Sequence, residues 1–504
     1  MIHSSINMDE TPKNLWEDTD GDKYQVHVTI PTIDSTIESE NVDERVVYIE
    51  DVEKRIQAYG ICGECKEPGT GWKWCQPCNA KRFKDNFKNW TSGNKDIDEF
   101  IQQSQLNAVH HKKYLEWIPF GKFQNINYIA KGGFGKIYTA EWPEGDIEYW
   151  DIKNQKWYRS PHDKYVLKSL NNFSDICSDF LDEIKSYLQI HFYDIVQCYG
   201  ITQNPNNKEY MIVLFYCNGG NLRNYLNKSK HYINYKSKID KLQQIARGLL
   251  DIHNAEKVHK DFHSGNILLD NHCPFISDLG MCQPANIKQT VKEEGIYGVL
   301  PYMAPEVLRG QQYTKAADIY SFGIIMNEFL SEEIPFNDIP HNEFLAIKIC
   351  KGIRPTISKD IPKLLADLII KCWDAEIKNR PTIKELYQIL TKWNEEKDNS
   401  ETEIYLQLEG CDKTREEKFK NRSNEDKYKS FQTHPQAIYT SRLLNFKNLP
   451  KPVNSSDLPS FQFSSDTSYT AQSTSENLIS ECLDVQLSEL ELNDIYQDDE
   501  HNIE

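Results

Sequence analysis

The chain has 504 residues, with 76 acidic and 58 basic side chains and a formal net charge of −18. A protein that binds nucleic acid with its whole surface needs positive charge to neutralise phosphates, so this balance excludes such a binder. The longest apolar run, Tyr210–Cys217, is far shorter than the about 20 residues that a membrane-spanning helix requires.

The acidic residues are concentrated at the two ends of the chain. Residues 1–55 have a net charge of −9, and residues 453–504 carry 12 acidic residues with no lysine or arginine. Charged segments that are rich in serine and threonine bury too little apolar surface to offset the entropy of the chain. We therefore expect both ends to be disordered and residues 398–452, which mix charge runs with apolar residues, to form a partly ordered linker.

Cysteine usage and the first residues indicate a reducing compartment. The chain has 13 cysteines, an odd number scattered along a long sequence, which does not suit a disulfide framework. Met1–Glu10 lacks the basic and apolar pattern of a secretory signal. We expect the cytoplasm, with the nucleus as the alternative.

Four clustered cysteines mark the region of residues 56–115. Cys62 and Cys65 form one C-x₂-C pair, and Cys75 and Cys78 form a second pair after nine intervening residues. Four thiolates on two such turns can close a tetrahedral zinc site and stabilise a segment too short for its own core. We expect a zinc-ribbon-like module, with a spacing similar to Ran-binding-protein type zinc fingers. Four free or buried cysteines are the alternative, and a redox dithiol would need only one pair.

Aromatic residues follow the cysteines at helical spacing. Phe83, Phe87 and Trp90 predict a helix, and Gly93 is expected to end it. Basic residues nearby would allow a protein- or RNA-recognition surface, although a solvated helix face is the simpler interpretation: Lys81, Arg82, Lys84 and Lys88. His110-His111 is expected to be a solvated pair.

A glycine-rich stretch, Ile129–Tyr138, comes next, between two expected strands. Glycines let backbone N–H groups approach phosphate oxygens closely, and Phe134 can cover the turn. Lys168 ends the apolar strand that begins at Tyr165, where a buried ammonium group needs a partner. Glu183, on an expected helix, can supply that partner. Taken singly, a plain hairpin, a surface lysine and a solvated helix face would be the preferred interpretations.

A polar loop within Val258–Leu269 carries the next candidates. Asp261 and Asn266 lie in this loop, which leads into an apolar strand, and Asp278 follows as a second isolated carboxylate. Oxygen ligands such as Asp278 and Asn266 suit Mg²⁺, which proteins bind through few side chains together with substrate phosphates. Asp261 remains free to accept a proton from a hydroxyl group.

These motifs occur in the order found in eukaryotic protein kinases, and the chain resembles that family over residues 118–397. The later motifs of the series are Ala304-Pro305-Glu306, Asp318 and Arg380. His263-Ser264-Gly265 and Cys372-Trp373 are similar to the tyrosine-kinase-like group, and the cysteine cluster with the acidic tail resembles large fungal kinase families. The resemblance implies an α+β, bilobal fold with a small β-rich N-lobe and a larger α-helical C-lobe, after the cysteine module and between disordered ends.

The resemblance also implies the roles of individual residues. Lys168, paired to Glu183, would hold the α- and β-phosphates of ATP; Asn266 and Asp278 would hold two Mg²⁺ ions; Asp261 would orient the substrate hydroxyl. The turn over the phosphates would comprise Ala130, Lys131, Gly132, Gly133, Phe134 and Gly135. The adenine would lie among Ile137, Val166 and Leu268, next to gatekeeper Leu214 and a hinge of Phe215, Tyr216 and Cys217. Glu306 and Arg380 would form a structural ion pair, and Asp318 would brace the catalytic loop.

The sequence departs from the family pattern at several places. Ala130 replaces the first glycine of the turn, and Lys260 replaces the arginine that precedes the catalytic aspartate. Since lysine holds phosphate only as a point charge, we expect weak dependence on activation-segment phosphorylation at Thr290. The residues that distinguish serine/threonine from tyrosine kinases are replaced by His263, Val299 and Gly265. The function of an insertion at residues 141–163 cannot be predicted.

Two function classes remain, an active enzyme and a pseudokinase that acts as a scaffold. Loss of activity usually affects the strand lysine or either aspartate, and Lys168, Asp261 and Asp278 are all present. We therefore expect an ATP-dependent protein kinase in intracellular signalling, with serine/threonine specificity preferred and dual specificity open. Expected partners are ATP, protein substrates, and a protein bound by the cysteine module or the tail, with no membrane or nucleic acid.

Overall fold

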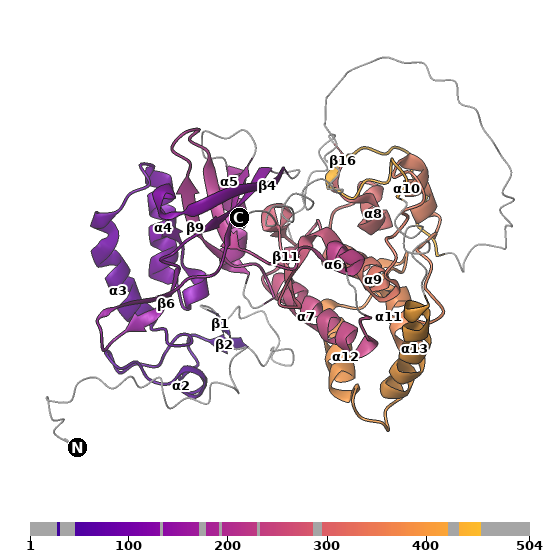
Figure 1. Cartoon of the computed structure of the whole chain (residues 1–504), viewed down its shortest axis with the longest axis horizontal. Coiled ribbons are helices and arrows are strands. Elements are labelled where there is room, and N and C mark those ends of the chain that lie inside the picture. Colours follow the sequence, from indigo (N-terminus) through magenta and orange to yellow (C-terminus); the bar gives the residue numbers. More distant parts are fainter. Residues whose placement is uncertain are drawn as a thin grey trace, which may run out of the picture. The chain divides into compact units, whose positions relative to one another are not determined.

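The structure is a computed structural model that describes residues 28–30, 46–131, 135–170, 178–190, 194–228, 232–285, 295–421 and 433–454. All of them lie within the unit formed by residues 1–458. Two lobes are evident in it, one built on a β-sheet and one built from helices (Figure 1). The expected bilobal α+β fold is therefore confirmed.

A six-stranded sheet forms the N-lobe, in the order β3-β9-β10-β8-β5-β4. Its strands are β3 (Glu116–Trp117), β4 (Gln124–Lys131), β5 (Gly135–Glu141), β8 (Tyr165–Leu170), β9 (Cys198–Gln203) and β10 (Tyr210–Phe215). All neighbours pair antiparallel except β3, which lies parallel to β9. Helix α5 (Ser178–Gln189) packs beside the sheet, and its Phe180 and Ile184 are buried. The apolar face of α5 therefore fixes the helix against the strands.

The C-lobe is a helical assembly around α7 (Tyr235–Asn254) and α9 (Lys315–Ser331). Helix α9 is buried nearly throughout, in agreement with the apolar pattern seen on all its faces. The other helices are α6 (Leu222–Lys228), α8 (Pro305–Leu308), α10 (Glu343–Cys350), α11 (Lys363–Cys372), α12 (Ile383–Glu396) and α13 (Glu403–Lys420). Helix α12 begins at a complete capping box between Thr382 and Glu385.

Short strand pairs and single helical turns connect these elements. The pairs are β1 (Val28–Ile30) with β2 (Val46–Tyr48), β6 (Asp146–Asp151) with β7 (Lys156–Ser160), β11 (Lys257–Val258) with β14 (Gln283–Pro284), β12 (Ile267–Asp270) with β13 (Cys273–Ile276), and β15 (Ile296–Gly298) with β16 (Arg442–Leu444). The 3₁₀ turns are Phe87–Asn89, His111–Lys113, Phe120–Lys122, Ser264–Asn266, Leu279–Met281, Leu300–Tyr302 and Ile377–Asn379.

The cysteine module contains α2 (Val52–Tyr59), α3 (Gln76–Asn86) and α4 (Lys95–Asn107). The predicted aromatic helix exists but ends at Asn86, followed by one 3₁₀ turn, and Gly93 lies beyond it at φ +81°. The expectation of a solvated histidine pair is wrong. His110 is buried, its ring lies 4.1 Å from that of His111, and its Nδ1 accepts a hydrogen bond from the backbone of Lys112.

The insertion at residues 141–163 is the docking site of this module. It folds into the β6–β7 hairpin, and its Trp157 stacks on Phe83 and Trp74, with ring centroids 5.0 and 6.0 Å apart. The guanidinium of Arg82 lies 4.2 Å from the ring centroid of Trp150 on the same hairpin. Because these aromatic groups exclude water between the two segments, the hairpin holds the module against the N-lobe.

The chain after residue 397 also packs on the C-lobe. Helix α13 buries Ile404 and Leu408, and Asp412 accepts a hydrogen bond from the backbone N–H of Tyr235 at 2.9 Å. Residues 433–454, which we call the C-terminal strap, return to the other side of the C-lobe and contribute β16 (Figure 1). Of residues 1–55, expected to be disordered, residues 28–30 and 46–55 are described and form β1, β2 and the start of α2. The rest of residues 1–45 and the tail after Asn454 lie outside the described residues.

Candidate active site

A chain of three charged groups crosses the two lobes. The ammonium of Lys168, on β8, donates to Glu183 Oε1 on α5 at 2.8 Å and to Asp278 Oδ1 at 2.9 Å. Burial lowers the pKa of Lys168, but the two carboxylates outweigh it and the pKa is raised overall. Burial raises the pKa of Glu183, with Lys168 acting against that rise. The lysine is therefore held as a cation in a site where an unpaired charge would be costly.

Local backbone geometry places each member of this chain. Strand β8 is paired on both sides, with Lys168 opposite Ile137 on β5 and Ile212 on β10. Asp278 follows β13 in the left-handed region, at φ 58° and ψ 72°, which turns its carboxylate toward the lysine. Gly280 lets Glu183 approach, because a Cβ there would lie 3.1 Å from Glu183 Oε2.

A buried carboxylate holds the loop that carries Asp261. Asp318, on α9, accepts hydrogen bonds from the backbone N–H groups of His259 at 2.8 Å and Lys260 at 3.2 Å. His253 Nε2 lies 3.0 Å from Asp318 Oδ2. Lys260 itself adopts φ 68°, an uncommon value for a non-glycine residue. The bracing role expected for Asp318 is thus confirmed by its contacts.

Asp261 is buried and faces a hydroxyl group. Its Oδ2 accepts a hydrogen bond from the Oγ of Ser441, in the C-terminal strap, at 2.5 Å. His263 Nε2 lies 3.5 Å from the same carboxylate, and Asn266 Nδ2 donates to the backbone oxygen of Asp261 at 2.9 Å. Burial would raise the pKa of Asp261, but His263 and Ser441 outweigh it and hold the pKa below its usual range. Asp261 is therefore an ionised acceptor aimed at a hydroxyl.

The donor set fits a divalent cation. Asn266 donates through Nδ2, so its Oδ1 is the atom that would meet a metal ion, and Asp278 contributes a partly exposed carboxylate. Asp261 Oδ1 is buried without a hydrogen-bond partner. All of these atoms are hard oxygens, which suit Mg²⁺ and do not suit a soft metal.

The residues expected around the adenine come from the N-lobe sheet, from the segment after β10 and from β12. Ile137, Val166 and Leu268 are half-buried, Leu214 lies opposite Val166, and Cys217 is buried. Backbone hydrogen bonds of 2.8 Å join Gly219 and Gly220 to Leu269, so the segment after the hinge is tied to β12. Ala130 and Lys131 end β4, and Gly135 begins β5. Gly132, Gly133 and Phe134, predicted for the turn between them, lie outside the described residues.

An ion pair fixes the end of the activation segment. Arg380 NH1 donates to Glu306 Oε1 at 2.7 Å, and NH2 donates to Oε2 at 2.8 Å, with both side chains buried. The expected pair is therefore present, in the bidentate geometry that favours arginine. The side chain of Tyr302 is buried, and its hydroxyl donates to Glu328 Oε2 at 2.6 Å.

In this structure Lys260 contacts Gln283 and Tyr313. Its Nζ donates to Gln283 Oε1 at 2.9 Å and lies 5.8 Å from the ring centroid of Tyr313. Thr290, the expected phosphorylation site, lies outside the described residues.

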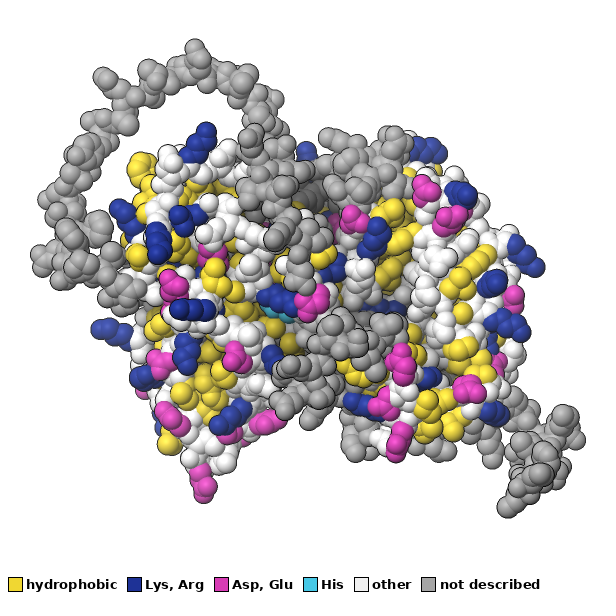
Figure 2. All heavy atoms as spheres, turned by 180° about the vertical axis from the view of Figure 1, so that it is seen from behind, with side chains coloured by type: hydrophobic (Ala, Val, Ile, Leu, Met, Phe, Trp, Pro, Cys, Tyr) yellow, Lys and Arg dark blue, Asp and Glu magenta, His cyan; other side chains and the backbone are white. Residues whose placement is uncertain are grey.

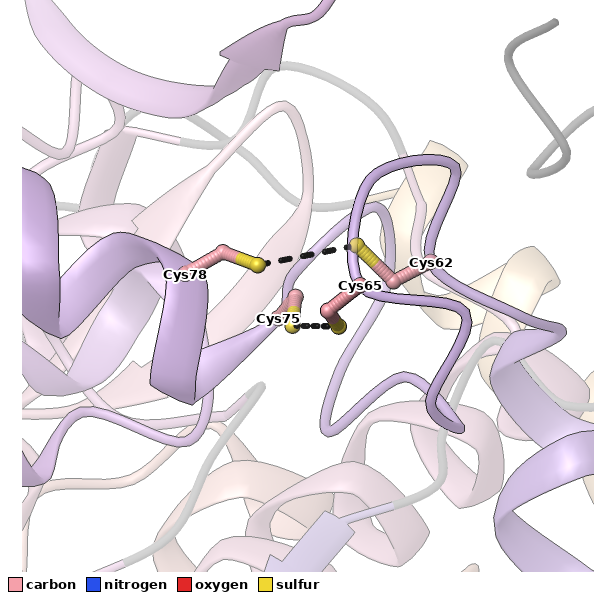
Figure 3. Close-up of side chains that lie close together, drawn as sticks. All are labelled: Cys62, Cys65, Cys75 and Cys78. Carbon is pink, nitrogen blue, oxygen red and sulfur yellow. Dashed lines mark hydrogen bonds between the residues drawn. The ribbon is translucent and has the colours of Figure 1, made fainter. Parts of the chain in front are cut away.

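The four clustered cysteines converge in the module before the kinase-like region (Figure 3). Their sulfur atoms all lie within 4.8 Å of one another, with Cys62 Sγ 3.9 Å from Cys78 Sγ and Cys65 Sγ 3.5 Å from Cys75 Sγ. Four convergent thiols at these distances form a donor set for one tetrahedral metal ion. The cluster could therefore hold a metal.

Two functional candidates were absent from the sequence prediction. Ser441 and the β6–β7 hairpin act through partners 180 residues and tens of residues away, respectively, and no local pattern marks Ser441. The three tryptophans of the insertion (Trp142, Trp150 and Trp157) were the one available signal, since exposed loops rarely carry so many aromatic residues.

Comparison with known proteins agrees with this geometry. Residues 123–390, more than half of the chain, match the model described as protein tyrosine and serine/threonine kinase. Serine/threonine-protein kinase VIK of Arabidopsis thaliana is 31% identical over 283 residues, which cover 54% of this chain and 60% of that protein. Serine/threonine-protein kinase STY46 of Arabidopsis thaliana is 27% identical over 278 residues, covering 55% and 44%. Putative serine/threonine-protein kinase/receptor R831 of Acanthamoeba polyphaga mimivirus is 30% identical over 308 residues, covering 60% and 17%.

The chain thus spans less than two thirds of the length of these relatives. Among the helices that the structure describes, none is long and apolar enough to cross a membrane.

Proposed function

The chain belongs to the protein tyrosine and serine/threonine kinase family, and from that premise we propose that it transfers the γ-phosphate of ATP to hydroxyl groups of proteins. The observation that carries the proposal is the connected chain Glu183–Lys168–Asp278, with Asp261 ionised beside it. A scaffold that only binds nucleotide has no need for a buried carboxylate directed at a hydroxyl group.

Each residue contributes through its charge. Lys168, kept cationic by Asp278 and Glu183, would hold the α- and β-phosphates, and Asp261 would accept the proton of the acceptor hydroxyl. Asn266 and Asp278 would hold Mg²⁺, which supplies charge neutralisation on the phosphates when bound. Ala130 to Gly135 would cover the phosphates, and Ile137, Val166, Phe215, Cys217 and Leu268 would surround the adenine.

Serine and threonine are the proposed acceptors. The names of the relatives are all those of serine/threonine kinases, and a serine hydroxyl lies 2.5 Å from Asp261 in this structure. A tyrosine hydroxyl stands about 4 Å farther from its backbone, so the same backbone path could not present it to the same carboxylate. Dual specificity stays the alternative.

The proposal is tested with the purified full chain and dephosphorylated casein. Transfer of phosphate that requires both ATP and Mg²⁺ and stops with EDTA is expected, with the label on serine or threonine. Nucleotide binding without transfer to casein or to the chain itself would favour the pseudokinase.

We propose zinc as the metal of the cysteine cluster. Four thiolates on two C-x₂-C turns select a soft or borderline ion, and zinc is the common one with that set. Metal analysis of the full chain, purified without chelator, should give about one equivalent of zinc, and Cys75→Ser should lose it. Less than half an equivalent from a folded chain contradicts the proposal.

Partners beyond ATP and protein substrates remain proposals. The face seen in Figure 2 intersperses Lys and Arg with Asp and Glu, so it offers no single-sign patch for nucleic acid. A protein partner of the cysteine module or tail is proposed. A reducing compartment, cytoplasmic or nuclear, is proposed from the cysteine content.

A further inference from the structure

The C-terminal strap brings its own serine to the catalytic carboxylate. Ser441 Oγ donates to Asp261 Oδ2 at 2.5 Å and lies 3.4 Å from His263 Nε2. The distance from Asp261 is that of a short charge-assisted hydrogen bond. Ser441 therefore occupies the place that an acceptor hydroxyl must take.

Backbone pairing fixes the direction of the strap through this place. Strand β16 lies antiparallel to β15 of the activation segment, with Gly298 opposite Arg442 and Ile296 opposite Leu444. The hydroxyl of Tyr297 donates to the backbone oxygen of Ser441 at 3.0 Å. Gly295 permits the approach, because a Cβ there would lie 2.5 Å from the oxygen of Leu444.

Side chains anchor the strap before the serine. The Tyr439 hydroxyl donates to the backbone oxygen of Pro335 at 2.8 Å, and its ring lies 4.2 Å from the guanidinium carbon of Arg223. His341 Nδ1 lies 2.8 Å from the oxygen of Ile438, and its own backbone N–H donates to Gln436 at 2.9 Å.

Further anchors follow the serine. Arg442 donates to the backbone oxygen of His341 at 2.6 Å. Leu444 is buried, 6% exposed, whereas its neighbour Leu443 is 58% exposed. The strap is therefore held on both sides of Ser441. Of its two adjacent leucines, Leu444 makes the apolar contact and Leu443 faces solvent.

We propose that Ser441 is an intramolecular phosphorylation site of this kinase; the proposal rests on the function proposed above. Ser441 Oγ attacks the γ-phosphorus of ATP, the bond from that phosphorus to the β–γ bridging oxygen breaks, and ADP leaves. The hydroxyl proton passes to the Asp261 carboxylate. The products are phosphoserine 441, ADP and the proton held by Asp261.

Transfer changes the charge of the strap and thereby releases it. Phosphoserine carries about −1.5 to −2 charges at neutral pH and, once Asp261 has released the proton to water, would face its carboxylate in a partly buried site. The serine hydrogen bond is lost, and like charges replace it. Until that event the strap excludes the hydroxyl groups of other proteins, so the first turnover opens the acceptor site.

The first experiment follows phosphate on the dephosphorylated full chain after addition of Mg²⁺ and ATP. Mass spectrometry should find Ser441 modified with a first-order rate constant that stays within twofold over a hundredfold range of protein concentration. The Lys168→Met chain, mixed with wild type, should acquire at least tenfold less phosphate on Ser441. Labelling of that chain at the wild-type rate, or a rate proportional to concentration, would overturn the intramolecular step.

The second experiment uses the adjacent leucines as a matched pair. Leu444→Asp should detach the strap and reduce phosphorylation of Ser441 at least tenfold. Wild type should show a lag in casein phosphorylation, and Leu444→Asp should remove it. Leu443→Asp should behave as wild type, since that side chain already faces solvent. Ser441→Ala should leave the strap bound, so its casein turnover should stay at least tenfold below that of pre-phosphorylated wild type. Thr440→Ala should not lower casein turnover.

Casein phosphorylation distinguishes failure of the Ser441 proposal from failure of the proposed kinase function. Phosphorylated casein with an unmodified Ser441, or equal behaviour of Leu444→Asp and Leu443→Asp, overturns this inference and leaves the proposed function intact. Absence of phosphate on casein and on the chain, in every variant, overturns both.

Discussion

The position of the buried Lys168 ammonium depends on residues from both lobes. It has carboxylate partners at 2.8 and 2.9 Å, on α5 and after β13, so its position requires both elements to be in place. The sequence could predict the partnership with Glu183, because a charge at the end of an apolar strand needs a counter-charge. The second contact, to Asp278, depends on the left-handed backbone at that residue and has no sequence signal of its own.

Lys168→Met should lower turnover on the order of 10²–10³-fold, because one preorganised charge is lost from the transition state. The midpoint of thermal unfolding should show that the domain still folds. Lys185→Met, on the exposed side of α5, is the control and should retain full activity. Turnover of Lys168→Met within a few-fold of wild type would contradict the role of Lys168.

Asp278→Asn should reduce turnover by a similar factor, because it removes one negative charge from the Mg²⁺ site while preserving its shape. The variant should also need more Mg²⁺ for half-maximal rate, which a titration measures. Asp367→Asn, an exposed aspartate of α11, should follow the wild-type curve. If the Mg²⁺ requirement of Asp278→Asn equals that of wild type, Asp278 is not a ligand.

Among the elements, the cysteine module contacts the C-terminal end of helix α5 in the N-lobe. Lys113, in the turn after α4, donates to the backbone oxygen of Leu188, near the end of α5, at 2.9 Å, and also to that of Ile190. Helix α5 is the element that carries Glu183. The module therefore contacts the helix that controls the lysine–glutamate pair.

Lys113 should make the stability of this contact depend on pH. Burial lowers the pKa of Lys113 to about 7, with Asp251 acting to raise it and Lys112 to lower it. In the unfolded chain the pKa is about 10.4, so between pH 7 and 10 the unfolded state binds more protons. The cost of the buried charge is full below pH 7 and disappears as pH rises, and stability should increase by up to about 1.4 kcal/mol per pH unit.

Urea unfolding followed by tryptophan fluorescence from pH 7 to pH 10 measures this increase. Lys113→Met should show a smaller rise in unfolding free energy over that range, while Lys95→Met, an exposed lysine of α4, should show the wild-type rise. Equal slopes in wild type and Lys113→Met would show that Lys113 is charged in the folded chain.

The β6–β7 hairpin gives a second prediction at this scale. Trp157→Ala removes ring contacts with Phe83 and Trp74 and should destabilise the module by about 2 kcal/mol. Tyr158→Ala, on the neighbouring, more exposed position, should cost less than about 1 kcal/mol. Unfolding free energies measure both, and an equal cost for the two would contradict docking through Trp157.

Local chemistry explains which elements could be predicted. Strand β10 and helix α9 follow from their apolar runs, and the charged motifs follow from spacing along short segments. The docking of the hairpin and the path of the strap arise from contacts between residues far apart in sequence. No period or composition marks such contacts, so the segment expected as a linker contributes both α13 and β16.

At the scale of the whole molecule, three appendages surround one catalytic framework. The module contacts α5, α13 packs on α7, and the strap lies between Asp261 and β15. The framework supplies charge and geometry, and we propose that the strap decides when the acceptor position is accessible. This division predicts that changes in the strap alter access more than they alter the chemical step.

The proposed phosphate transfer requires Asp261 to accept the proton of the acceptor hydroxyl. The most direct measurement compares casein phosphorylation by wild type and Asp261→Asn, with ATP binding measured on both. Mg²⁺-dependent transfer by wild type is expected, with a loss on the order of 10²–10⁴-fold in Asp261→Asn and ATP affinity within a few-fold. Equal transfer by the two chains, or no transfer by a wild-type chain that binds ATP, would contradict it.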